Sequence, residues 1–527
     1  MFYKWQDEAI KTISGNSGII SAPTGSGKTL VSYVWSGLVD IYGSVTKPSC
    51  RVIFTAPIKA LSNERYLELK SMGLDAGLET GDFKKNENAP VLCCTQEIYT
   101  LKYAALPGQK VVIDEFHYIF NDSERSRAYI DGLRKTSPKS DILVMSATFG
   151  DPEKIKNYLE KTALRNFALY ETDERVTELV FKRKGTRFRF IKNALVFVFS
   201  KKGAEYLASE ISKTRRFRPE AKKRLREIAS ILEVGRIPEC MMRGVGTYYG
   251  SMLPKEKLLV EMAFRERILD VVVGTDALSL GVNLPAETVV FGQMAKFIDG
   301  PLTKNEFLQM AGRAGRKGFF NTGYVTYIPH SKCENYDYDT ASLYFETVEK
   351  PCESARISVH PSVGRLLKQE VDVETEAKVM GMYSLPERSY HDSIIEIQDL
   401  LHSIKQSLGT IRDQKFRKQV RKVLADIWND EMEVYANIAV ACLFARTKSP
   451  DAMEVAGILR NTERNYLQAL LKVKRMQNRL PEGYSLSGMH KVDAKVNFID
   501  SSVFGFEEKI EKIKNSGSLS DEDGEEE

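Results

Sequence analysis

The sequence predicts an α/β protein with two consecutive α/β units, each built on a parallel sheet, followed by a mainly α-helical region. Three observations support this prediction. Short apolar runs alternate with amphipathic segments over residues 18–150, which is the pattern of buried parallel strands joined by crossover helices. A second series of the same kind covers residues 194–328. After about residue 360 the strand-like runs stop and helical periodicity dominates.

The expected strands are short runs rich in Val, Ile and Leu, each followed by a polar or Gly/Pro-bearing turn. In the first unit they lie at residues 18–22, 51–56, 90–94, 110–115 and 141–146. In the second unit they lie at residues 194–200, 244–249, 270–275, 288–291 and 323–328, with helical segments at 203–212 and 254–267. A chain of 527 residues is also too long for one ordinary hydrophobic core, so several domains are expected.

Four regions are predicted along the chain. The two α/β units cover residues 1–165 and 166–330, a mainly helical accessory region covers 331–510, and a disordered acidic tail covers 511–527. Within the accessory region the helical patterns are clearest at 393–408 and 450–476. The end of the tail has almost no apolar content, so we expect no folded structure there.

Charge is unevenly distributed. The formal net charge is +5, but the last seven residues, DEDGEEE, contain six acids, and without those six the net charge rises to +11. A basic body favours a polyanionic partner such as nucleic acid, although basic residues also form ordinary solvated surface. The acidic tail is expected either to aid solubility or to compete with nucleic acid for basic surface.

Several classes of protein are excluded. No stretch of 18 apolar residues could span a membrane, and the N-terminus lacks the apolar core of an export signal. The seven cysteines form no CxxC pair and, with six scattered histidines, offer no zinc-site spacing. Their odd number suits a reducing compartment, so we expect a cytoplasmic protein in which Cys93 and Cys94 are buried strand residues.

A candidate phosphate-binding loop follows the first strand. It closes a strand and opens a helix, which is the context such loops require, and it consists of Ala22, Pro23, Thr24, Gly25, Ser26, Gly27, Lys28 and Thr29. The glycines let backbone N–H groups approach phosphates, Lys28 reaches the β- and γ-phosphates, and the Thr29 hydroxyl ligates Mg²⁺. A nucleoside triphosphate and Mg²⁺ are therefore the expected cofactors. The alternative, a glycine-rich helix cap without a ligand, has the same local pattern.

A pair of carboxylates follows the strand at 110–113. A carboxylate at the carboxyl end of a strand in this type of fold lies across from the phosphate loop. We expect Asp114 to hold Mg²⁺, through water, and Glu115 to orient the attacking water or take its proton.

Two arginines in the second α/β unit are candidates for stabilising the transition state of phosphoryl transfer. Arg313 and Arg316 lie three residues apart in the segment 309–318, so on one helical face both could point at one ligand. Phosphoryl transfer needs cations that neutralise the charge developing on the γ-phosphate. The alternative is a basic helix end that forms surface ion pairs.

Taken in order, these segments resemble the motifs of superfamily 2 helicases of the DExH type, and within that group the superkiller-type branch of RNA helicases. The resemblance covers residues 1–330 and also includes segments 5–10, 55–64, 80–82, 94–98, 146–148, 196–202, 274–285 and 296–318. It implies two tandem RecA-like domains with ATP in the cleft between them and a nucleic-acid strand across their top.

The resemblance also implies roles for single residues. Gln6 would read adenine, His117 and Gln309 would belong to the hydrolysis motifs, and Ser146 and Thr148 would couple hydrolysis to strand movement. One departure is the pair at 248–249, which is Tyr-Tyr where the branch usually has two histidines. After residue 330 the likeness is faint, and the remaining 197 residues could hold abbreviated forms of the family's winged helix and helical bundle.

Nucleic-acid contacts are expected where strands end in both units. Small hydroxyl and basic residues at these positions suit phosphate contacts, which hold a strand without reading its sequence. The candidates are Pro57, Lys59, Thr95 and Gln96 in the first unit and Ser200, Lys201, Thr275 and Asp276 in the second. Further positive charge lies at 183–190, 213–230 and 412–422, although each of these segments could equally be solvated surface.

Two local features have open interpretations. In the RFRF segment at 187–190 the two arginines would share one face if the segment were a strand. The turn at 297–302 is either a short hairpin at a duplex junction or a plain loop.

We therefore predict an ATP-hydrolysing RNA helicase or translocase that moves 3′-to-5′ on RNA with a single-stranded 3′ region; the polarity follows from the resemblance alone. The preference for RNA rests on segments 57–66, 80–82 and 296–318, which resemble the RNA-acting branch more closely than the DNA-acting one. The alternatives are a DNA repair helicase, a non-processive RNA-remodelling ATPase, and a nucleotide-gated clamp. The complete hydrolysis set argues against the clamp, because a binding module has no use for it.

Overall fold

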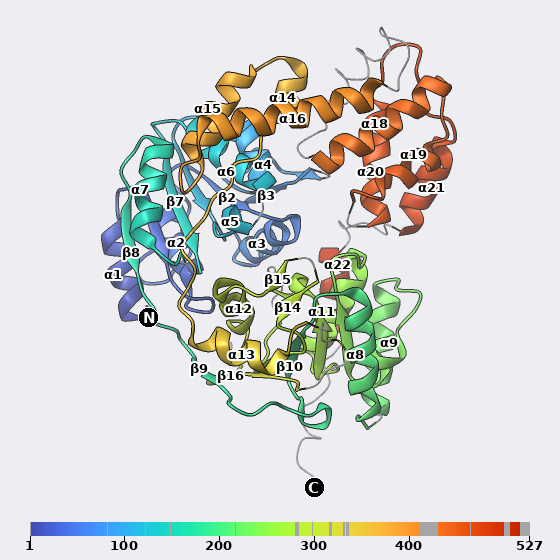
Figure 1. Ribbon diagram of the computed structural model, residues 1–527. Coiled ribbons are helices and arrows are strands. Elements are labelled where there is room, and N and C mark those ends of the chain that lie inside the picture. The colour runs from blue at the N-terminus through green and yellow to red at the C-terminus, as the bar shows by residue number, and fades with distance from the viewer. Residues whose placement is uncertain are drawn as a thin grey trace.

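The computed structural model describes residues 2–81, 83–121, 123–147, 149–216, 218–279, 284–297, 299–315, 319–329, 333, 337–409, 431–463, 465–499 and 506–516. They form two α/β domains, one above the other in Figure 1, and a helical region that extends from the top of the first domain. Within these ranges every helix is too short or too polar to cross a bilayer.

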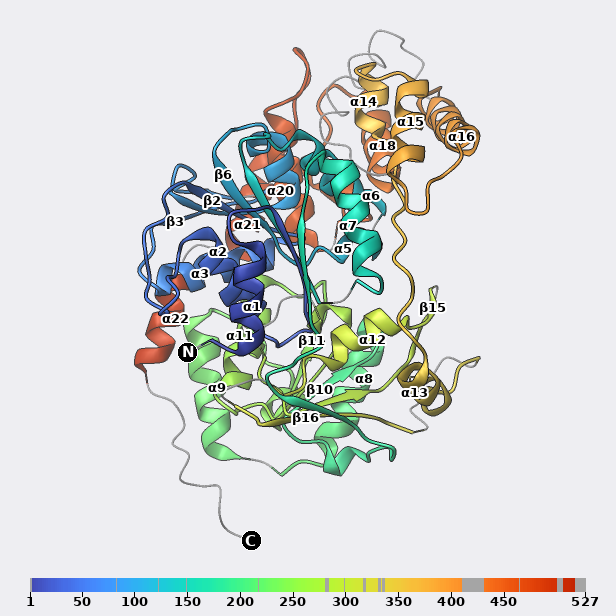
Figure 2. The ribbon, with the colours of Figure 1, turned by 90° about the vertical axis from the view of Figure 1, so that its left-hand side faces the viewer.

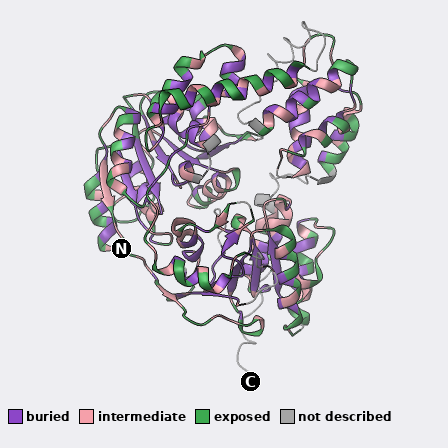
Figure 3. Cartoon of the chain, viewed as in Figure 1, coloured by how far each residue is buried: buried purple, intermediate pink, exposed green. Residues whose placement is uncertain are grey.

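The first domain is built on an eight-stranded sheet with the order β4-β3-β5-β2-β6-β7-β1-β8, in which only β4 is antiparallel to its neighbour. The central strands are buried on both faces, which explains why they appear in the sequence as continuous apolar runs (Figure 3). The strands are β1 (Gly18–Ser21), β2 (Arg51–Ala56), β3 (Ala76–Glu79), β4 (Lys84–Lys85), β5 (Val91–Thr95), β6 (Gln109–Ile113), β7 (Asp141–Ser146) and β8 (Ala168–Glu171). The helices are α1 (Lys4–Ile13), α2 (Lys28–Ser36), α3 (Lys59–Ser71), α4 (Gln96–Ile98), α5 (Tyr118–Asn121), α6 (Ser123–Lys135) and α7 (Pro152–Ala163).

The second domain is built on a six-stranded, all-parallel sheet with the order β11-β12-β10-β13-β16-β9. Its strands are β9 (Glu178–Phe181), β10 (Ala194–Phe197), β11 (Val245–Tyr248), β12 (Val271–Gly274), β13 (Thr288–Phe291) and β16 (Thr322–Tyr327). Its helices are α8 (Lys201–Lys213), α9 (Pro219–Ile231), α10 (Glu239–Met242), α11 (Pro254–Arg265) and α12 (Lys304–Ala311). A separate hairpin joins β14 (Ala295–Lys296) to β15 (Gly300–Pro301), so the turn at 297–302 is a hairpin and not a plain loop.

The helical region connects to both domains. After α13 (Thr340–Glu349), which packs on the second domain, an extended segment runs past α12 to the top of the molecule (Figure 2). There α14 (Val363–Lys368), α15 (Val373–Tyr383) and α16 (Tyr390–Gly409) lie over the first domain. The bundle beyond them contains α18 (Glu431–Arg446), α19 (Ala452–Leu459), α20 (Tyr466–Gln477) and α21 (Met489–Ile499). The final helix, α22 (Phe506–Asn515), packs on α9 of the second domain.

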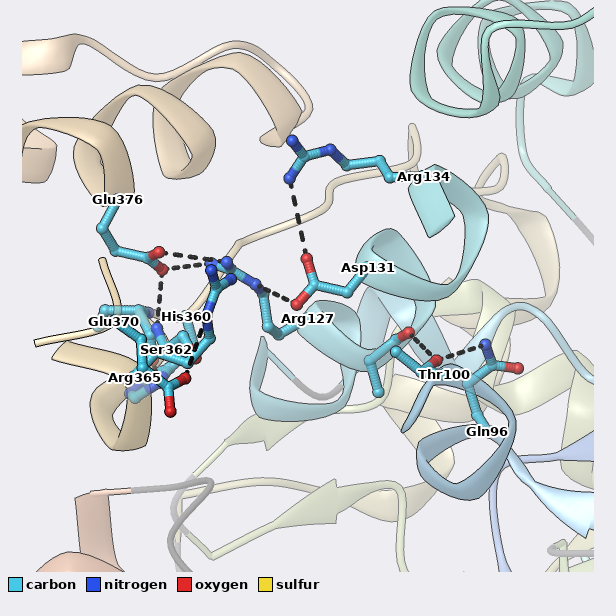
Figure 4. A network of polar contacts seen from close by, with 12 residues as sticks. Gln96, Thr100, Arg127, Asp131, Arg134, His360, Ser362, Arg365, Glu370 and Glu376 are labelled. Carbon is cyan, nitrogen blue, oxygen red and sulfur yellow. Dashed lines mark hydrogen bonds and ion pairs between the residues drawn. The ribbon is translucent and has the colours of Figure 1, made fainter. Parts of the chain in front are cut away.

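A buried ion pair fastens the helical region to the first domain. Arg127 of α6 donates hydrogen bonds to both carboxylate oxygens of Glu376 on α15, one of them 3.2 Å from Nη2 (Figure 4). Glu376 also accepts from the backbone N–H of Ser362 at 2.8 Å, and Arg127 also donates to Asp131 at 3.0 Å. Because every partner is satisfied, the pair holds α14 and α15 in one position on α6.

The structure confirms the predicted strands, since each of the runs named above contains one. Cys93 and Cys94 are buried in β5, and burial raises the pKa of the Cys93 thiol to about 12. The sequence did not predict strands β3, β4, β8 and β9 or the two hairpin strands. They are short, and except for β3 they lie partly exposed, so they lack the continuous apolar run of a buried strand.

Four predictions need correction. Strand β8 pairs with β1 in the first sheet, so the first domain continues past residue 165 to residue 171. The predicted tail from residue 511 begins inside α22, whose Ile513 is fully buried; residues 517–527 lie outside the described ranges. The helix expected over 450–476 is broken into α19 and α20 between residues 460 and 465. The RFRF segment forms a 3₁₀ turn at 188–190, so its arginines do not line a strand.

Candidate active site

The phosphate-binding loop adopts the strand–loop–helix form that the sequence predicts. It joins the end of β1 to the start of α2, and Gly25 and Gly27 have φ of +82° and +94°, a left-handed conformation that favours glycine. The Lys28 ammonium donates to the carbonyl oxygens of Ala22 at 2.9 Å and Pro23 at 3.2 Å. The loop therefore curls around this cation, and burial lowers the Lys28 pKa although the neighbouring carboxylates oppose the shift.

Gln6 and Ser26 complete the loop. Gln6 is 2% exposed; its amide donates to the carbonyl of Gly27 at 3.1 Å and accepts from the N–H of Tyr3 at 2.9 Å. Gln6 thus lies directly against the loop, as its expected role near the base requires. Ser26 is fully buried, and among the described residues its hydroxyl has no hydrogen-bond partner. A phosphate oxygen in the loop would satisfy it, so the residues present fit a nucleotide phosphate.

The predicted metal residues converge on one point. The Asp114 carboxylate, directly after β6, is 2.9 Å from Nη2 of Arg65, and the same nitrogen is 3.4 Å from the Thr29 hydroxyl. Two hard oxygen donors that both lie close to one cationic group fit the ligand chemistry of Mg²⁺. Burial and the Glu115 charge raise the Asp114 pKa, while Arg65 opposes the shift.

Arg65 is a site residue that the sequence does not reveal. It lies in α3, in the segment assigned only to nucleic-acid binding, and it also donates to Tyr33 and Glu68, each at 2.8 Å. Arg65 lies six residues after Lys59, about 1.7 helical turns, so the two side chains do not share one face of the helix. Spacing alone does not say that the side chain reaches Asp114, because that contact depends on how α3 packs on the sheet.

Glu115 lies beside Asp114 in a strained conformation, with φ +51°. Burial works against its ionisation, but electrostatic interactions with His117, Lys28 and Arg313 outweigh burial and hold the pKa of Glu115 below its usual range. Its Oε2 atom is 3.4 Å from His117 Nδ1. A half-buried, ionised carboxylate in this position can accept a proton from water.

His117 links the hydrolysis site to the predicted coupling segment. Its Nδ1 atom is 3.4 Å from the Ser146 hydroxyl at the end of β7, and burial lowers its pKa. The structure thus brings Glu115, His117 and Ser146 into one chain of neighbours. Thr148, the second predicted coupling residue, lies outside the described residues.

The second domain contributes the end of α12. Gly312 follows that helix and lies against the phosphate loop, because a Cβ there would be 2.8 Å from the Thr24 Cβ. Arg313 donates to the carbonyl of Ser279, and its charge lowers the pKa of both Lys28 and Glu115 of the first domain. Gln309 lies half-buried on α12. Arg316 lies outside the described residues.

Arg175 is a second residue that sequence reasoning missed. It lies in the connection between the two sheets and donates to the carbonyl oxygens of Ala314 at 3.1 Å and Gly312 at 3.4 Å. It therefore supports the loop that presents Arg313. An isolated arginine in a polar connection gives no sequence signal for this contact.

The predicted nucleic-acid residues separate into two groups. Lys59, Ser200, Lys201 and Asp276 are exposed where strands end, and Thr275 is half-buried beside them. Pro57 and Thr95 are buried, and Gln96 is 0% exposed. The Gln96 amide accepts from the Thr55 hydroxyl at 2.7 Å and lies under α6, so its side chain supports the first domain and does not face a strand.

One helix of the C-terminal bundle reaches the exposed group. Lys59 Nζ donates to Gln468 Oε1 on α20 at 3.2 Å, and Arg475 of the same helix donates to the carbonyl of Gly81 at 3.0 Å. The residues of α20 therefore lie beside two of the segments that the sequence assigns to strand binding. The basic segment 412–422 lies outside the described residues.

One RecA-like domain carries a phosphate loop and paired carboxylates, and these face an arginine of a second such domain. This arrangement defines the class of P-loop proteins that bind a nucleotide between two RecA-like domains. Residues 3–155 match the DEAD/DEAH box helicase family, and residues 174–318 match the helicase conserved C-terminal domain family. The chain belongs to the superfamily 2 helicases of the DExH type.

Curated relatives and a solved structure agree with this class. The chain is 29% identical over 452 residues to the DExH-box ATP-dependent RNA helicase DExH9 of Arabidopsis thaliana, covering 69% of this chain and 44% of that protein. It is 27% identical over 410 residues to the exosome RNA helicase MTR4 of Homo sapiens, covering 62% and 38%. The fold is similar to that of the Mycobacterium smegmatis helicase Lhr bound to ssDNA and AMP-PNP, with a TM-score of 0.50 and 18% identity, covering 80% of this chain and 60% of that one. The chain thus spans less than half the length of these two curated relatives.

Proposed function

We propose that this protein is an ATP-dependent RNA helicase or translocase that moves 3′-to-5′ along the strand it binds. The observation that supports this most is the approach of Arg313 to the Lys28–Glu115 site from the other domain. A site divided in this way works only when the domains close, so a strand held by both domains favours hydrolysis by favouring closure.

The chemistry follows from the positions of the side chains. Lys28 and the loop amides bind the phosphates, Glu115 orients the attacking water and accepts its proton, and Arg313 neutralises charge on the γ-phosphate. Mg²⁺, held by Thr29 and Asp114, would supply further charge neutralisation on the phosphate oxygens. Arg65 must leave Asp114 at least in part for the metal to reach that carboxylate.

The strand path proposed here runs along the exposed ends of β2, β10 and β12 and beneath α20. The contact of α20 with Lys59 and Gly81 supports this path, because the bundle then covers the strand from the side away from ATP. The hairpin at 295–301 carries Phe297, which is 89% exposed. An exposed ring on a hairpin can stack on a terminal base pair, which suits a duplex junction.

The preference for RNA is supported by the names of the two curated relatives, which are both RNA helicases. Phosphate contacts are the same in both polymers, so discrimination must come from the ribose 2′-hydroxyl or from strand shape. Because the similar helicase structure holds ssDNA, DNA must be tested directly.

The test measures ATPase stimulation and unwinding on matched RNA and DNA duplexes with 3′ or 5′ overhangs, at one stated salt concentration. We expect activity with a 3′ RNA overhang and none in the Glu115→Gln variant. Lys59→Ala should weaken strand binding and lower the slope of log affinity against log salt concentration by about one, the value for one phosphate contact. Lys70 is exposed on the same helix, and Lys70→Ala should change neither the affinity nor the slope. Preferential unwinding from a DNA loading strand would refute the RNA assignment and favour a DNA helicase.

A further inference from the structure

Glu353, in the extended segment after α13, closes the amino end of α12. Its two carboxylate oxygens accept from the N–H groups of Lys304 at 2.7 Å and Asn305 at 3.2 Å, the first two residues of that helix. The next N–H, of Glu306, is capped by the Thr303 hydroxyl at 3.2 Å. A helix normally leaves its first N–H groups without partners inside the helix. Here Glu353, which lies 49 positions after the first residue of the helix, supplies two of those partners.

The other end of α12 lies against the phosphate loop. The helix has eight residues, so it is about 12 Å long and behaves as a short rigid rod. At its carboxyl end Gly312 touches Thr24 of the phosphate loop, and Arg313 follows directly. A shift at the Glu353 end is therefore transmitted to the position of Arg313.

Glu353 is held from the side of the first domain. Gly150, shortly after the predicted coupling segment, has φ +66°, and a Cβ there would collide with the carbonyl oxygen of Glu353, so the two backbones are in direct contact. Beyond Glu353, the side chains of Ala355 and Ile357 are buried in the core of the first domain, and the Ser126 hydroxyl of α6 donates to the Ser358 carbonyl at 2.6 Å. The segment is thus part of the first domain at one end and a cap for the second domain at the other.

Further contacts fix the carboxylate. Lys350 Nζ is 3.1 Å from its Oε1 atom, and Lys304 Nζ donates to the carbonyls of Thr347 and Val348 at the end of α13. Burial opposes ionisation of Glu353, but the hydrogen bonds from the backbone N–H groups of Lys304 and Asn305 and from the Lys350 side chain outweigh burial and lower the pKa of Glu353. The carboxylate is therefore charged at neutral pH and complements the positive end of the α12 dipole.

We infer that Glu353 is a positioning residue for Arg313: by capping α12 from a segment anchored beside Gly150, it sets where the arginine stands when the two domains meet on the nucleotide. The inference rests on the proposed function, because it assigns Arg313 to hydrolysis. It makes the accessory segment part of the catalytic geometry, although Glu353 itself touches no nucleotide.

The test compares Glu353→Ala and Glu353→Gln with a matched control, Glu349→Ala, which changes an exposed carboxylate four residues earlier. For Glu353→Ala we expect kcat for ATP to fall by about ten- to a hundredfold, since a displacement of about 1 Å at a reacting group has that effect. The KM and the affinity for a fluorescent ATP analogue should stay within about twofold. Glu353→Gln should be intermediate, because an amide has one acceptor oxygen where the carboxylate has two.

A double-mutant cycle separates positioning from general stability. If Glu353 acts through Arg313, adding Glu353→Ala to Arg313→Ala should reduce kcat by less than about twofold. The inference would be overturned if Glu353→Ala lowered kcat by the same factor in the Arg313→Ala variant as in the wild-type protein. It would also be overturned if Glu353→Ala abolished binding of the ATP analogue.

If the wild-type protein hydrolysed no ATP, the proposed function would be refuted. Hydrogen exchange would still test the positioning role of Glu353, because it needs no turnover. Faster exchange in Glu353→Ala, confined to α12 and residues 312–315, supports the positioning role. Unchanged exchange there, or faster exchange over the whole second domain, overturns it.

Discussion

The two halves of the nucleotide site are built in different ways. In the first domain, Lys28, Thr29, Asp114 and Glu115 follow directly on buried strands, and their contacts lie within one sheet and its loops. In the second domain, Arg313 stands at the end of a short helix whose position depends on Arg175 and Glu353, far away in the sequence.

We expect this difference to assign nucleotide binding to the first domain and the rate of hydrolysis to the meeting of both domains. Residues placed by a local strand–loop–helix segment can bind a nucleotide whether or not the domains are closed. An arginine that arrives from another domain contributes only in the closed state, so it can act on the rate without acting on ground-state affinity. Under the proposed function, the first domain therefore binds the nucleotide and the second domain completes the reaction site.

The largest expected effect is that of Arg313→Ala. Turnover should fall by about 10³-fold or more, as for other arginine fingers, because charge on the γ-phosphate is no longer neutralised. ATP should still bind, since Lys28 and the loop amides are intact. Single-turnover hydrolysis and analogue binding measure the two quantities, with Arg236→Ala, an exposed arginine of the same domain, as the control. If Arg313→Ala lost ATP binding as well as turnover, the proposed difference between the two halves would be wrong.

The next effect contrasts two residues of the first domain. Glu115→Gln should lower turnover by about 10²- to 10⁴-fold with ATP still bound, because it removes the group that accepts the proton of the attacking water. Lys28→Ala should weaken ATP binding by about ten- to a hundredfold, since charged hydrogen bonds to the phosphates are lost. Wild-type turnover in purified Glu115→Gln protein would show that the site assignment is wrong.

The smallest effect on turnover is expected from Arg127→Ala. It leaves Glu376 buried beside Ser362 without its main cation, so the free energy of unfolding should fall by about 3 kcal/mol. Turnover at 25 °C should fall only a few-fold, through a looser segment around Glu353. Lys135→Ala, exposed on the same helix, is the control. Denaturation midpoints and steady-state rates measure both quantities. A change in ATP affinity would contradict the expectation that this ion pair holds the helical region and does not act on the phosphate loop.

The sequence by itself determined the features that depend on local contacts. Buried parallel strands need continuous apolar runs, so the strands and the order of the two domains could be predicted. The phosphate loop needs small residues and a lysine at fixed spacing, and a carboxylate must follow a neighbouring strand, so Lys28, Asp114 and Glu115 could be predicted as well. Arg313 was found by its motif.

The tertiary structure decided what depends on packing between distant segments. Gln96 follows a strand as its neighbours do, yet α6 covers it and buries it in the first domain. Residues 168–171 lie past the predicted boundary, yet they add an edge strand beside β1. Arg65, Arg175 and Glu353 have no motif, because each acts through hydrogen bonds or ion pairs to residues that lie far away in the sequence. Such contacts are specified by the relative placement of helices on sheets, which is the sum of many weak apolar contacts and leaves no pattern in the sequence near the residue that uses it.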